Sequence, residues 1–463
     1  MPLPRVLLPP TGHDWDALRA ELGVPEAFPP DVEAEARAAR PVLPARDLTE
    51  VPFLTVDPPG SVDLDQAMAL ERRGTGYRVR YAIADVAAFV VPGGAVDREA
   101  HWRGLTLYAP DRRTPLHPTV LSEGAASLLA GQDRPAVVWD LSLDADGELV
   151  ETRVERALVR SRRQLDYPSV QQELDAGTAS ADLALLREIG LLRHARARER
   201  DAVELPTPEQ LVGPDGDLSF RAPLPVEQWN AEVSLLTGMA AAGVMLAGGV
   251  GVLRTMPTPD PADVASLRRS ALALGVAWAA DESYGDVLSA LDPTLPEAAA
   301  VLNLATRLLR GAGYTAFEGM LPALTTHSGV AAPYAHCTAP LRRLADRYAA
   351  ETCLALVAGR EVPDWVRAAL PALPEEMAAA DQRARALDRA VVDLAEACLL
   401  QHRVGEAFRA VVVDANGRGG TVQLVHPAVR ARLDGADAPL GETVDVVLES
   451  VDVPARSVRF RLA

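Results

Sequence analysis

Residues 55–70 read TVDPPGSVDLDQAMAL, and this stretch sets three carboxylates close together in a pattern of strand, turn and strand. If residues 62–67 return as a strand after the turn at PPGS, Asp63 and Asp65 point to one face and Asp57 reaches that face across the turn. Such carboxylates repel one another unless a hard cation neutralises them, and Mg²⁺ accepts carboxylates, waters and phosphates. The stretch therefore predicts a metal site suited to phosphoryl chemistry, with an acidic surface turn as the alternative.

The composition indicates a large globular protein with an acidic surface. The chain has 463 residues, of which 48% are hydrophobic and 24% charged, and this length suggests two to four domains. Its formal charge of −18 opposes a polyanionic partner at long range. All 46 basic residues are arginine, whose guanidinium forks onto phosphates, so a local binding channel remains compatible with the acidic total.

Other features concern the cellular setting. The N-terminal residues lack the pattern of a secretory leader, and the three cysteines are too scattered for a disulfide framework or a zinc cluster. Residues 233–253 carry no charge over a length close to bilayer thickness, but their small residues and the GGVG sequence favour a buried helix. We expect a cytoplasmic monomer with no membrane partner.

The periodicity divides the chain into three parts of an α+β protein. Residues 1–45 contain two short helical patterns, as in a small helix-turn-helix-like unit. Residues 46–405 begin with alternating patterns typical of a mixed or antiparallel sheet and continue with helices, including one capped by Asp260. Residues 406–463 return to a period of two, which predicts a small closed β-barrel.

Five segments in order give the sequence a resemblance to a known family. They are the aspartate stretch, YAIADVAAFV, the long segment from VDREAHWRG to LLAGQDRP, VEQWNAEVSLLTGMAAAG, and HSGVAAPYAHCTAPLRRLADRYAAE. Together they resemble the RNase II/RNase R (RNB) family of 3′-5′ exoribonucleases over residues 50–355. The resemblance implies an RNB-type catalytic domain with a C-terminal OB-type barrel that binds RNA.

For the reaction, the resemblance implies Mg²⁺-dependent, stepwise 3′-to-5′ hydrolysis of single-stranded RNA to nucleoside 5′-monophosphates, with Mn²⁺ as a substitute. Asp57, Asp63 and Asp65 fall on family aspartates that hold metal and its waters, and Asp65 is also assigned a catalytic role. The fourth family aspartate is Gln66 here. An amide oxygen can still bind Mg²⁺, although the site then has one negative charge fewer.

For the RNA, the resemblance places Arg342 at the scissile phosphate and aromatic side chains against the last bases. Arg342 and Arg343 are expected in the first turn of a helix, where Arg342 could alternatively pair with Asp346 in solvent. Arg343 is expected to contact the RNA backbone or to pack beside it. Tyr108, Tyr167 and Phe220 match family positions that stack on bases, with core packing as the alternative for Tyr167 and Phe220.

Two other functions remain open from the sequence. Gln66 suits an RNA-binding protein that keeps the fold and has weakened or lost catalysis. A DNA-directed or general phosphodiesterase would carry the same metal ligands and phosphate clamp.

Overall fold

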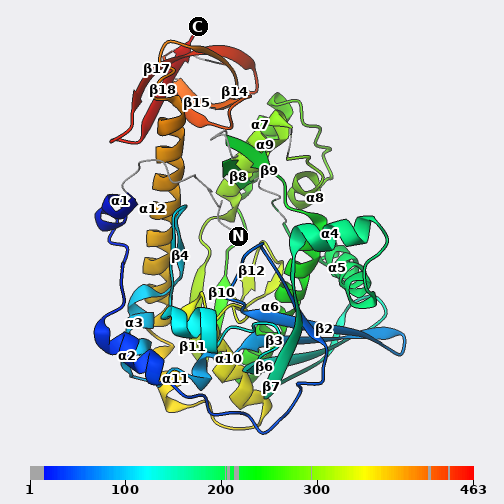
Figure 1. The fold of residues 1–463 in the computed structure, drawn as a ribbon. Helices are drawn as coiled ribbons and strands as arrows, with labels where there is room; N and C mark the ends of the chain where they lie inside the picture. The colour runs from blue at the N-terminus through cyan, green and yellow to red at the C-terminus, as the bar shows by residue number, and fades with distance from the viewer. Residues whose placement is uncertain are drawn as a thin grey trace.

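The structure of the protein is a computed structural model that describes residues 15–203, 205, 209–212, 218–293, 295–415, 419–435, 438 and 440–463. It contains two β-barrels joined by a long helix, with further helices packed around the first barrel (Figure 1). The α+β class, the mixed sheet of the catalytic part and the C-terminal barrel predicted from the sequence are all confirmed.

The first barrel contains five strands. They follow the order β1 (Phe53–Asp57), β2 (Gln66–Arg73), β3 (Gly76–Ala84), β6 (Asp133–Leu143) and β7 (Leu149–Asp166). Neighbours pair antiparallel except β1 and β7, which run parallel and close the barrel. This closure places Asp57, the last residue of β1, beside Asp166 at the end of β7.

Both faces of the barrel wall are buried, as the sequence of β3 illustrates. The odd-numbered Val79, Tyr81 and Ile83 enter one hydrophobic core, whereas the even-numbered Ala82 and Ala84 enter another. Because side chains alternate along a strand, the large residues fill one face and the alanines allow close approach on the other. The wall therefore gives the attached loops a rigid base.

The first barrel and the helices and short hairpins around it form one part of the molecule, called the first body. The helices are α1 (Trp15–Glu21), α2 (Pro30–Ala38), α3 (Ala95–Arg103), α4 (Tyr167–Asp175), α5 (Ala181–Glu199), α6 (Pro225–Gly248), α7 (Pro261–Ala273), α8 (Tyr284–Ser289), α9 (Pro296–Ala305), α10 (Leu344–Val357), α11 (Asp364–Ala369) and α12 (Leu373–Leu400). The short strands are β4 (Leu107–Tyr108), β5 (Arg113–Thr114), β8 (Glu209–Val212), β9 (Leu218–Arg221), β10 (Val250–Thr255), β11 (Gly313–Glu318), β12 (Thr326–His327) and β13 (Ala332–Pro333). Single helical turns cover Val86–Ala88, Leu121–Ala125 and Thr306–Leu309.

Two local expectations were wrong. Asp63 and Asp65 lie in a loop, because β2 begins only at Gln66. Arg342 and Arg343 precede α10, which begins at Leu344, and they lie in a turn whose amides donate to the Ala339 carbonyl. Local patterns suggested a strand in the first case and a helix in the second. In both cases the segment instead makes side-chain contacts with residues far away in the sequence, which are described below. The cap predicted at Asp260 is confirmed, since its carboxylate accepts from the Ala262 amide at 2.7 Å.

Helix α6 contains the uncharged segment noted in the sequence. By length and composition it could cross a membrane, and 50% of its most apolar window is buried inside the protein. Val233, Leu236 and Ala240 lie in the main core cluster. These contacts are those of a core helix, and the expectation of no membrane partner stays a prediction.

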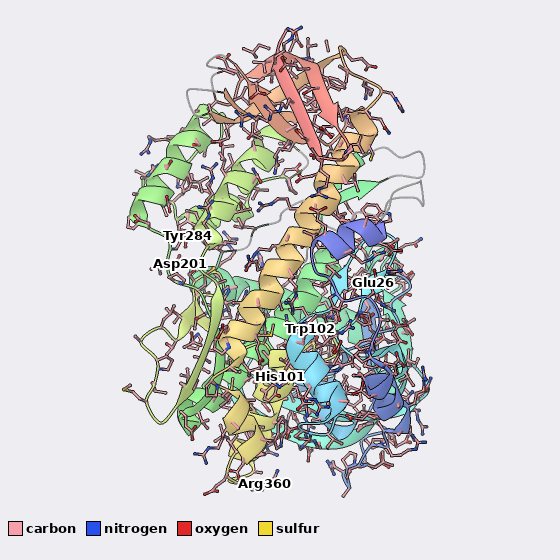
Figure 2. The ribbon with its side chains drawn as sticks, turned by 90° about the vertical axis from the view of Figure 1, so that its left-hand side faces the viewer. Glu26, His101, Trp102, Asp201, Tyr284 and Arg360 are labelled. Atoms are coloured by element: carbon pink, nitrogen blue, oxygen red, sulfur yellow. The ribbon has the colours of Figure 1, made fainter. Side chains whose placement is uncertain are left out.

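The C-terminal barrel contains β14 (Ala407–Ala415), β15 (Gly419–Leu424), β16 (Arg430–Asp434), β17 (Thr443–Asp452) and β18 (Ser457–Leu462). Helix α12 runs from the first body to this barrel (Figure 2). Arg430 anchors the junction, since its Nη1 donates to Asn303 of α9 at 2.5 Å and its amide donates to Glu396 of α12 at 2.9 Å. The barrel is thus fixed to two helical elements.

Candidate active site

The aspartate loop, residues 58–65, is fixed by hydrogen bonds on both sides of its turn. Gly60 has a φ of +77°, a conformation that glycine adopts without steric cost. Ser127 Oγ donates to the Val62 carbonyl at 2.7 Å and accepts from the Leu64 amide at 2.9 Å. The loop therefore presents its two carboxylates from a defined backbone.

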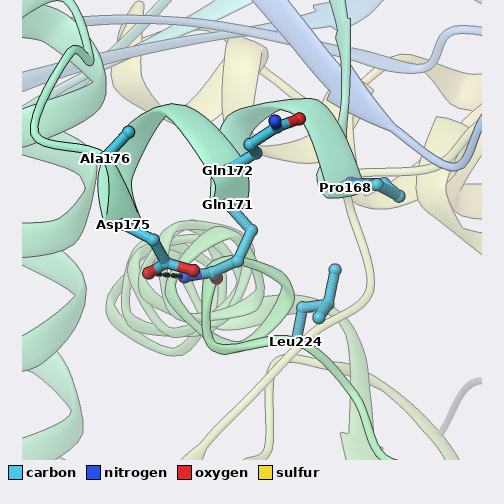
Figure 3. Close-up of a pocket in the computed structure, with 6 residues that line it drawn as sticks. All are labelled: Pro168, Gln171, Gln172, Asp175, Ala176 and Leu224. Carbon is cyan, nitrogen blue, oxygen red and sulfur yellow. Dashed lines mark hydrogen bonds between the residues drawn. The ribbon is translucent and has the colours of Figure 1, made fainter.

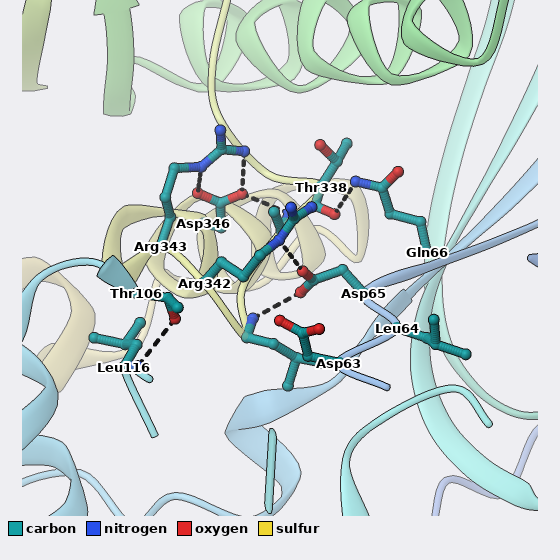
Figure 4. A network of polar contacts seen from close by, with 12 residues as sticks. Asp63, Leu64, Asp65, Gln66, Thr106, Leu116, Thr338, Arg342, Arg343 and Asp346 are labelled. Atoms are coloured by element: carbon teal, nitrogen blue, oxygen red, sulfur yellow. Dashed lines mark hydrogen bonds and ion pairs between the residues drawn. The ribbon is translucent and has the colours of Figure 1, made fainter. Parts of the chain in front are cut away.

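Asp65 is buried and is held by the segment that carries the predicted phosphate-binding arginine. One carboxylate oxygen accepts from the Leu341 amide and the other from Arg342 Nε, both at 2.7 Å (Figure 4). Burial raises the pKa of Asp65 to about 7, although the Arg342 guanidinium and the Leu341 amide act in the opposite direction. The ion pair joins residues 277 positions apart, so it brings the aspartate loop and the arginine turn into one site.

Asp346 pairs with Arg343 and not with Arg342. Arg343 Nε and Nη2 donate to the two oxygens of Asp346 at 2.9 and 2.8 Å, and Asp346 also accepts from the Ala339 amide. The solvent pair considered between Arg342 and Asp346 is therefore absent. Arg343 keeps 24% of its side chain exposed, and the Arg342 side chain keeps 36%.

Asp63 has a partner that no sequence pattern suggested. Arg113 of β5 donates through Nη1 to Asp63 at 2.7 Å and through Nε to Glu123 at 2.9 Å. Arg113, Asp63 and Glu123 lie in separate segments with no regular spacing. A match to the family's sequence at position 113 was therefore the only signal that could have identified Arg113. The candidate site thus includes a second arginine.

Gln66 is engaged through both ends of its amide. Its Nε2 donates to the Thr338 carbonyl at 2.8 Å, and its Oε1 accepts from the Tyr81 hydroxyl. A carboxylate cannot donate to Thr338, so the amide has a structural role specific to glutamine at this position. Burial first, and then the nearby Tyr167, Asp57 and other groups, raise the pKa of Tyr81 well above its usual value.

Tyr167 lies close to Asp57 on the other side of the site. Burial, followed by the Asp57 carboxylate, raises the pKa of its phenol. Asn230 of α6 donates to the Tyr167 hydroxyl at 3.0 Å and lies 3.5 Å from the Val56 carbonyl. Tyr167 is therefore partly buried and held at its polar end, while Asp57 shares its surroundings with two phenols.

Tyr108 comes close to Arg342 through a short hairpin. β4 pairs with β5 so that Tyr108 lies opposite Arg113, and the Thr106 amide donates to the Arg342 carbonyl at 2.9 Å. The tip of the hairpin is held by α1, because Arg19 donates to both oxygens of Asp111 at 2.8 Å. The N-terminal helix thus fixes the hairpin that carries Tyr108.

Phe220 is described by its backbone alone. Its backbone pairs with Gln210 between β8 and β9, and its side chain lies outside the described residues. In the C-terminal barrel, Arg432 donates to Asp434 at 2.5 Å and Arg459 donates to the same carboxylate at 3.0 Å. The two arginines therefore share one carboxylate within the barrel.

An open hollow lies near, but outside, the aspartate loop. An open cavity of about 570 Å³ lies beside α4, lined by Pro168, Gln171, Gln172, Asp175, Ala176 and Leu224 (Figure 3). Pro168 directly follows Tyr167, so the cavity adjoins the site. The described residues that line it include none of those predicted to act on RNA.

The predicted metal ligands fit a hard cation by their chemistry. Asp57, Asp63, Asp65 and Gln66 all offer oxygen atoms, which Mg²⁺ prefers. In the described part of the chain, no group of three or more histidine, cysteine, aspartate or glutamate side chains is arranged for a metal ion. Asp63 and Asp65 are instead paired with Arg113 and Arg342, so a cation would compete with guanidinium groups for these oxygens.

Comparisons with known proteins identify the family of this chain. Residues 45–358 match the model of the RNB domain, and residues 406–463 match the RNase II-type exonuclease C-terminal S1 domain. The exosome complex exonuclease RRP44 homolog A of Arabidopsis thaliana is 29% identical over 397 residues, which are 80% of this chain and 42% of that protein. The chain therefore spans less than half of that relative.

Solved structures share the fold at low sequence identity. Mycoplasma genitalium RNase R, in complex with ribose methylated single-stranded RNA, has a TM-score of 0.79 and 19% identity, covering 99% of this chain and 76% of that one. Yeast Ssd1, described as a pseudonuclease, has a TM-score of 0.70 and 18% identity, covering 90% of this chain and 54% of that one. Because the RNB domain match spans well over half of the sequence and an S1 domain follows it, the chain belongs to the RNB family of RNase II-type exonucleases.

Proposed function

We propose that this protein is a magnesium-dependent 3′-to-5′ exoribonuclease that hydrolyses single-stranded RNA stepwise to nucleoside 5′-monophosphates. The observation that carries the proposal is the Asp65–Arg342 ion pair, which places a metal-type ligand beside a phosphate-type ligand. The single-stranded RNA in the complex of the Mycoplasma genitalium relative supports the choice of substrate.

Asp57, Asp63, Asp65 and Gln66 would hold the cation. When bound, Mg²⁺ (or Mn²⁺) supplies charge neutralisation at the phosphate and lowers the pKa of a bound water. Arg342 binds the scissile phosphate: Asp65 holds its Nε, and its two Nη groups can donate to phosphate oxygens. Although burial opposes it, the Asp65 carboxylate keeps the pKa of Arg342 well above its usual value, so the guanidinium stays charged.

Tyr108 and Tyr167 would position the 3′-terminal bases by stacking, which tolerates any sequence because every base has a π-face. Arg343 would contact the RNA backbone through its exposed edge, while its bidentate pair with Asp346 fixes its direction. A stacking role for Phe220, a monomeric state and a cytoplasmic location stay predictions.

The second candidate is an RNA-binding protein with weakened or lost turnover, and Gln66 is the observation that favours it. The amide replaces a charge and is tied to Thr338 and Tyr81, and the fold is also that of a protein described as a pseudonuclease. A DNA-directed or general phosphodiesterase is the third possibility, since the paired Asp65 and Arg342 suit a metal ion and a phosphate, which RNA and DNA share.

A direct test uses 5′-labelled single-stranded RNA and the same sequence as DNA, each incubated with the protein and Mg²⁺. A ladder of shortening RNA, with nucleoside 5′-monophosphates detected by chromatography and DNA left intact, is the expected result. Tight binding of RNA without products would favour the second candidate, and equal cleavage of DNA would favour the third.

Tyr108→Ala is expected to lengthen the end product of RNA degradation. Each stacked base contributes about 1–3 kcal/mol, so a short RNA held by fewer stacked rings dissociates earlier. Gel analysis of the final products, compared with Tyr108→Phe, which keeps the ring, measures this effect. An unchanged product length in Tyr108→Ala would remove this side chain from the RNA site.

Gln66→Asp and Gln66→Glu are expected to lower the Mg²⁺ concentration for half-maximal hydrolysis by about threefold or more, because each adds a charge to the metal ligands. Without metal, both substitutions place a carboxylate against the Thr338 carbonyl and should destabilise the protein by about 1–3 kcal/mol. Mg²⁺ titrations of activity and of thermal unfolding measure the two effects. Superimposed titration curves for all three proteins would place residue 66 outside the metal shell.

A further inference from the structure

Arg113 stands between two carboxylates on different segments. Its guanidinium donates to Asp63 of the aspartate loop through Nη1 at 2.7 Å and to Glu123 through Nε at 2.9 Å, and its Nη2 lies 2.8 Å from the same Glu123 oxygen in an ion pair. The exposed fractions of the three side chains are 27%, 13% and 26%, so the network is partly shielded from solvent. Such shielding makes each charge contact stronger than at an open surface.

The backbone on both sides fixes this arrangement. Arg113 lies in β5, opposite Tyr108, and Glu123 lies in the π-helical turn Leu121–Ala125. Single π-helical turns are rare and occur frequently at functional sites. Nearby, Arg134 donates to the Gly124 carbonyl at 3.2 Å, which holds the turn in place. Glu123 is therefore positioned to keep Arg113 independently of Asp63.

The two contacts of Arg113 have opposite consequences for a cation. While Arg113 donates to Asp63, an oxygen of this predicted ligand is occupied by a positive group that also repels a second cation. Glu123 pairs with the same guanidinium through a hydrogen bond from Nε and an ion pair with Nη2, so Arg113 can release Asp63 without becoming an unpaired, half-buried charge.

We propose that Arg113 is a positioning residue that occupies Asp63 in the metal-free protein and competes with the divalent cation, and that Glu123 retains Arg113 when Asp63 turns to the cation. This inference concerns the metal site of the proposed exoribonuclease and rests on that function. It makes cation binding an exchange of partners at Asp63, with Glu123 as the acceptor that permits the exchange.

The test measures Mn²⁺ binding to the full chain without RNA, by electron paramagnetic resonance of free Mn²⁺. Arg113→Gln should bind Mn²⁺ on the order of tenfold more tightly, since a charge-assisted contact no longer competes. Glu123→Gln should bind it about threefold or more weakly, because Arg113 then has only Asp63. Arg112→Gln is the matched control: it removes the neighbouring charge, which pairs with Asp16 and not with Asp63.

The double variant Arg113→Gln/Glu123→Gln separates this exchange from a general electrostatic effect. If Glu123 acts only through Arg113, the double variant binds Mn²⁺ as tightly as Arg113→Gln alone; additive effects would overturn the proposal. Equal affinity of Arg113→Gln and Arg112→Gln would also overturn it, as would a change in thermal stability without a change in Mn²⁺ affinity. Because no RNA is present, these results stand apart from whether the protein hydrolyses RNA.

Discussion

Asp65→Asn is expected to reduce RNA hydrolysis on the order of 100- to 1000-fold while leaving RNA affinity nearly unchanged. Both oxygens of Asp65 accept hydrogen bonds, one from Leu341 and one from Arg342. Whichever way an asparagine amide is turned, its NH₂ group faces one of these donors. The substitution therefore removes a metal ligand and also releases the anchor of Arg342.

The measurement pairs single-turnover hydrolysis in Mg²⁺ with RNA binding by fluorescence anisotropy in the presence of a chelator. Asp260→Asn is a suitable control, because it makes the same chemical change at the cap of α7, where asparagine caps about as well as aspartate. Hydrolysis by Asp65→Asn at more than a few percent of the wild-type rate would contradict the role assigned to Asp65.

Arg342→Lys is expected to lower the rate of the chemical step about 100-fold. A lysine ammonium can pair with Asp65, but its three N–H donors all lie on one nitrogen atom, so it cannot hold this carboxylate and also offer a phosphate the planar two-nitrogen fork of a guanidinium. A guanidinium can do both, because its hydrogen bond to Asp65 uses Nε and the two Nη groups can donate to a phosphate. The loss should appear in kcat, with a change of only a few-fold in RNA affinity.

Arg160→Lys provides the control for this second variant. Arg160 forms a bidentate pair with Asp133 between β6 and β7, remote in sequence from the arginine turn. If Arg342→Lys kept a large part of the wild-type kcat, a simple positive charge would suffice and the proposed fork would be wrong.

The sequence predicted the elements of the fold well because its signals are local. Alternating residues in β3, the cap at Asp260 and the period of two after residue 406 each act within a few neighbours. The family resemblance added the order of the segments. Neither the local patterns nor the family resemblance predicted the parallel pairing of β1 with β7, which joins residues far apart in the sequence and closes the barrel.

The contacts among the predicted site residues could not be read from the sequence. Helical spacing suggested a partner for Arg342 in Asp346, yet the chain at Arg342 is a turn and its partner is Asp65. Arg113 had no pattern to mark it, since the hairpin and the aspartate loop meet only in the folded protein. Likewise, no sequence pattern showed that Arg432 and Arg459 of the C-terminal barrel share Asp434.

The contacts of α1 also bear on the order in which the chain can assemble during synthesis. Arg19 and Asp111 are 92 residues apart, whereas Glu21 meets Arg456 across 435 residues, with bonds of 2.9 and 2.6 Å. A contact over so long a separation costs more loop-closure entropy and forms only after the second partner has left the ribosome. The hairpin carrying Tyr108 can therefore dock on α1 before the C-terminal barrel joins the same helix.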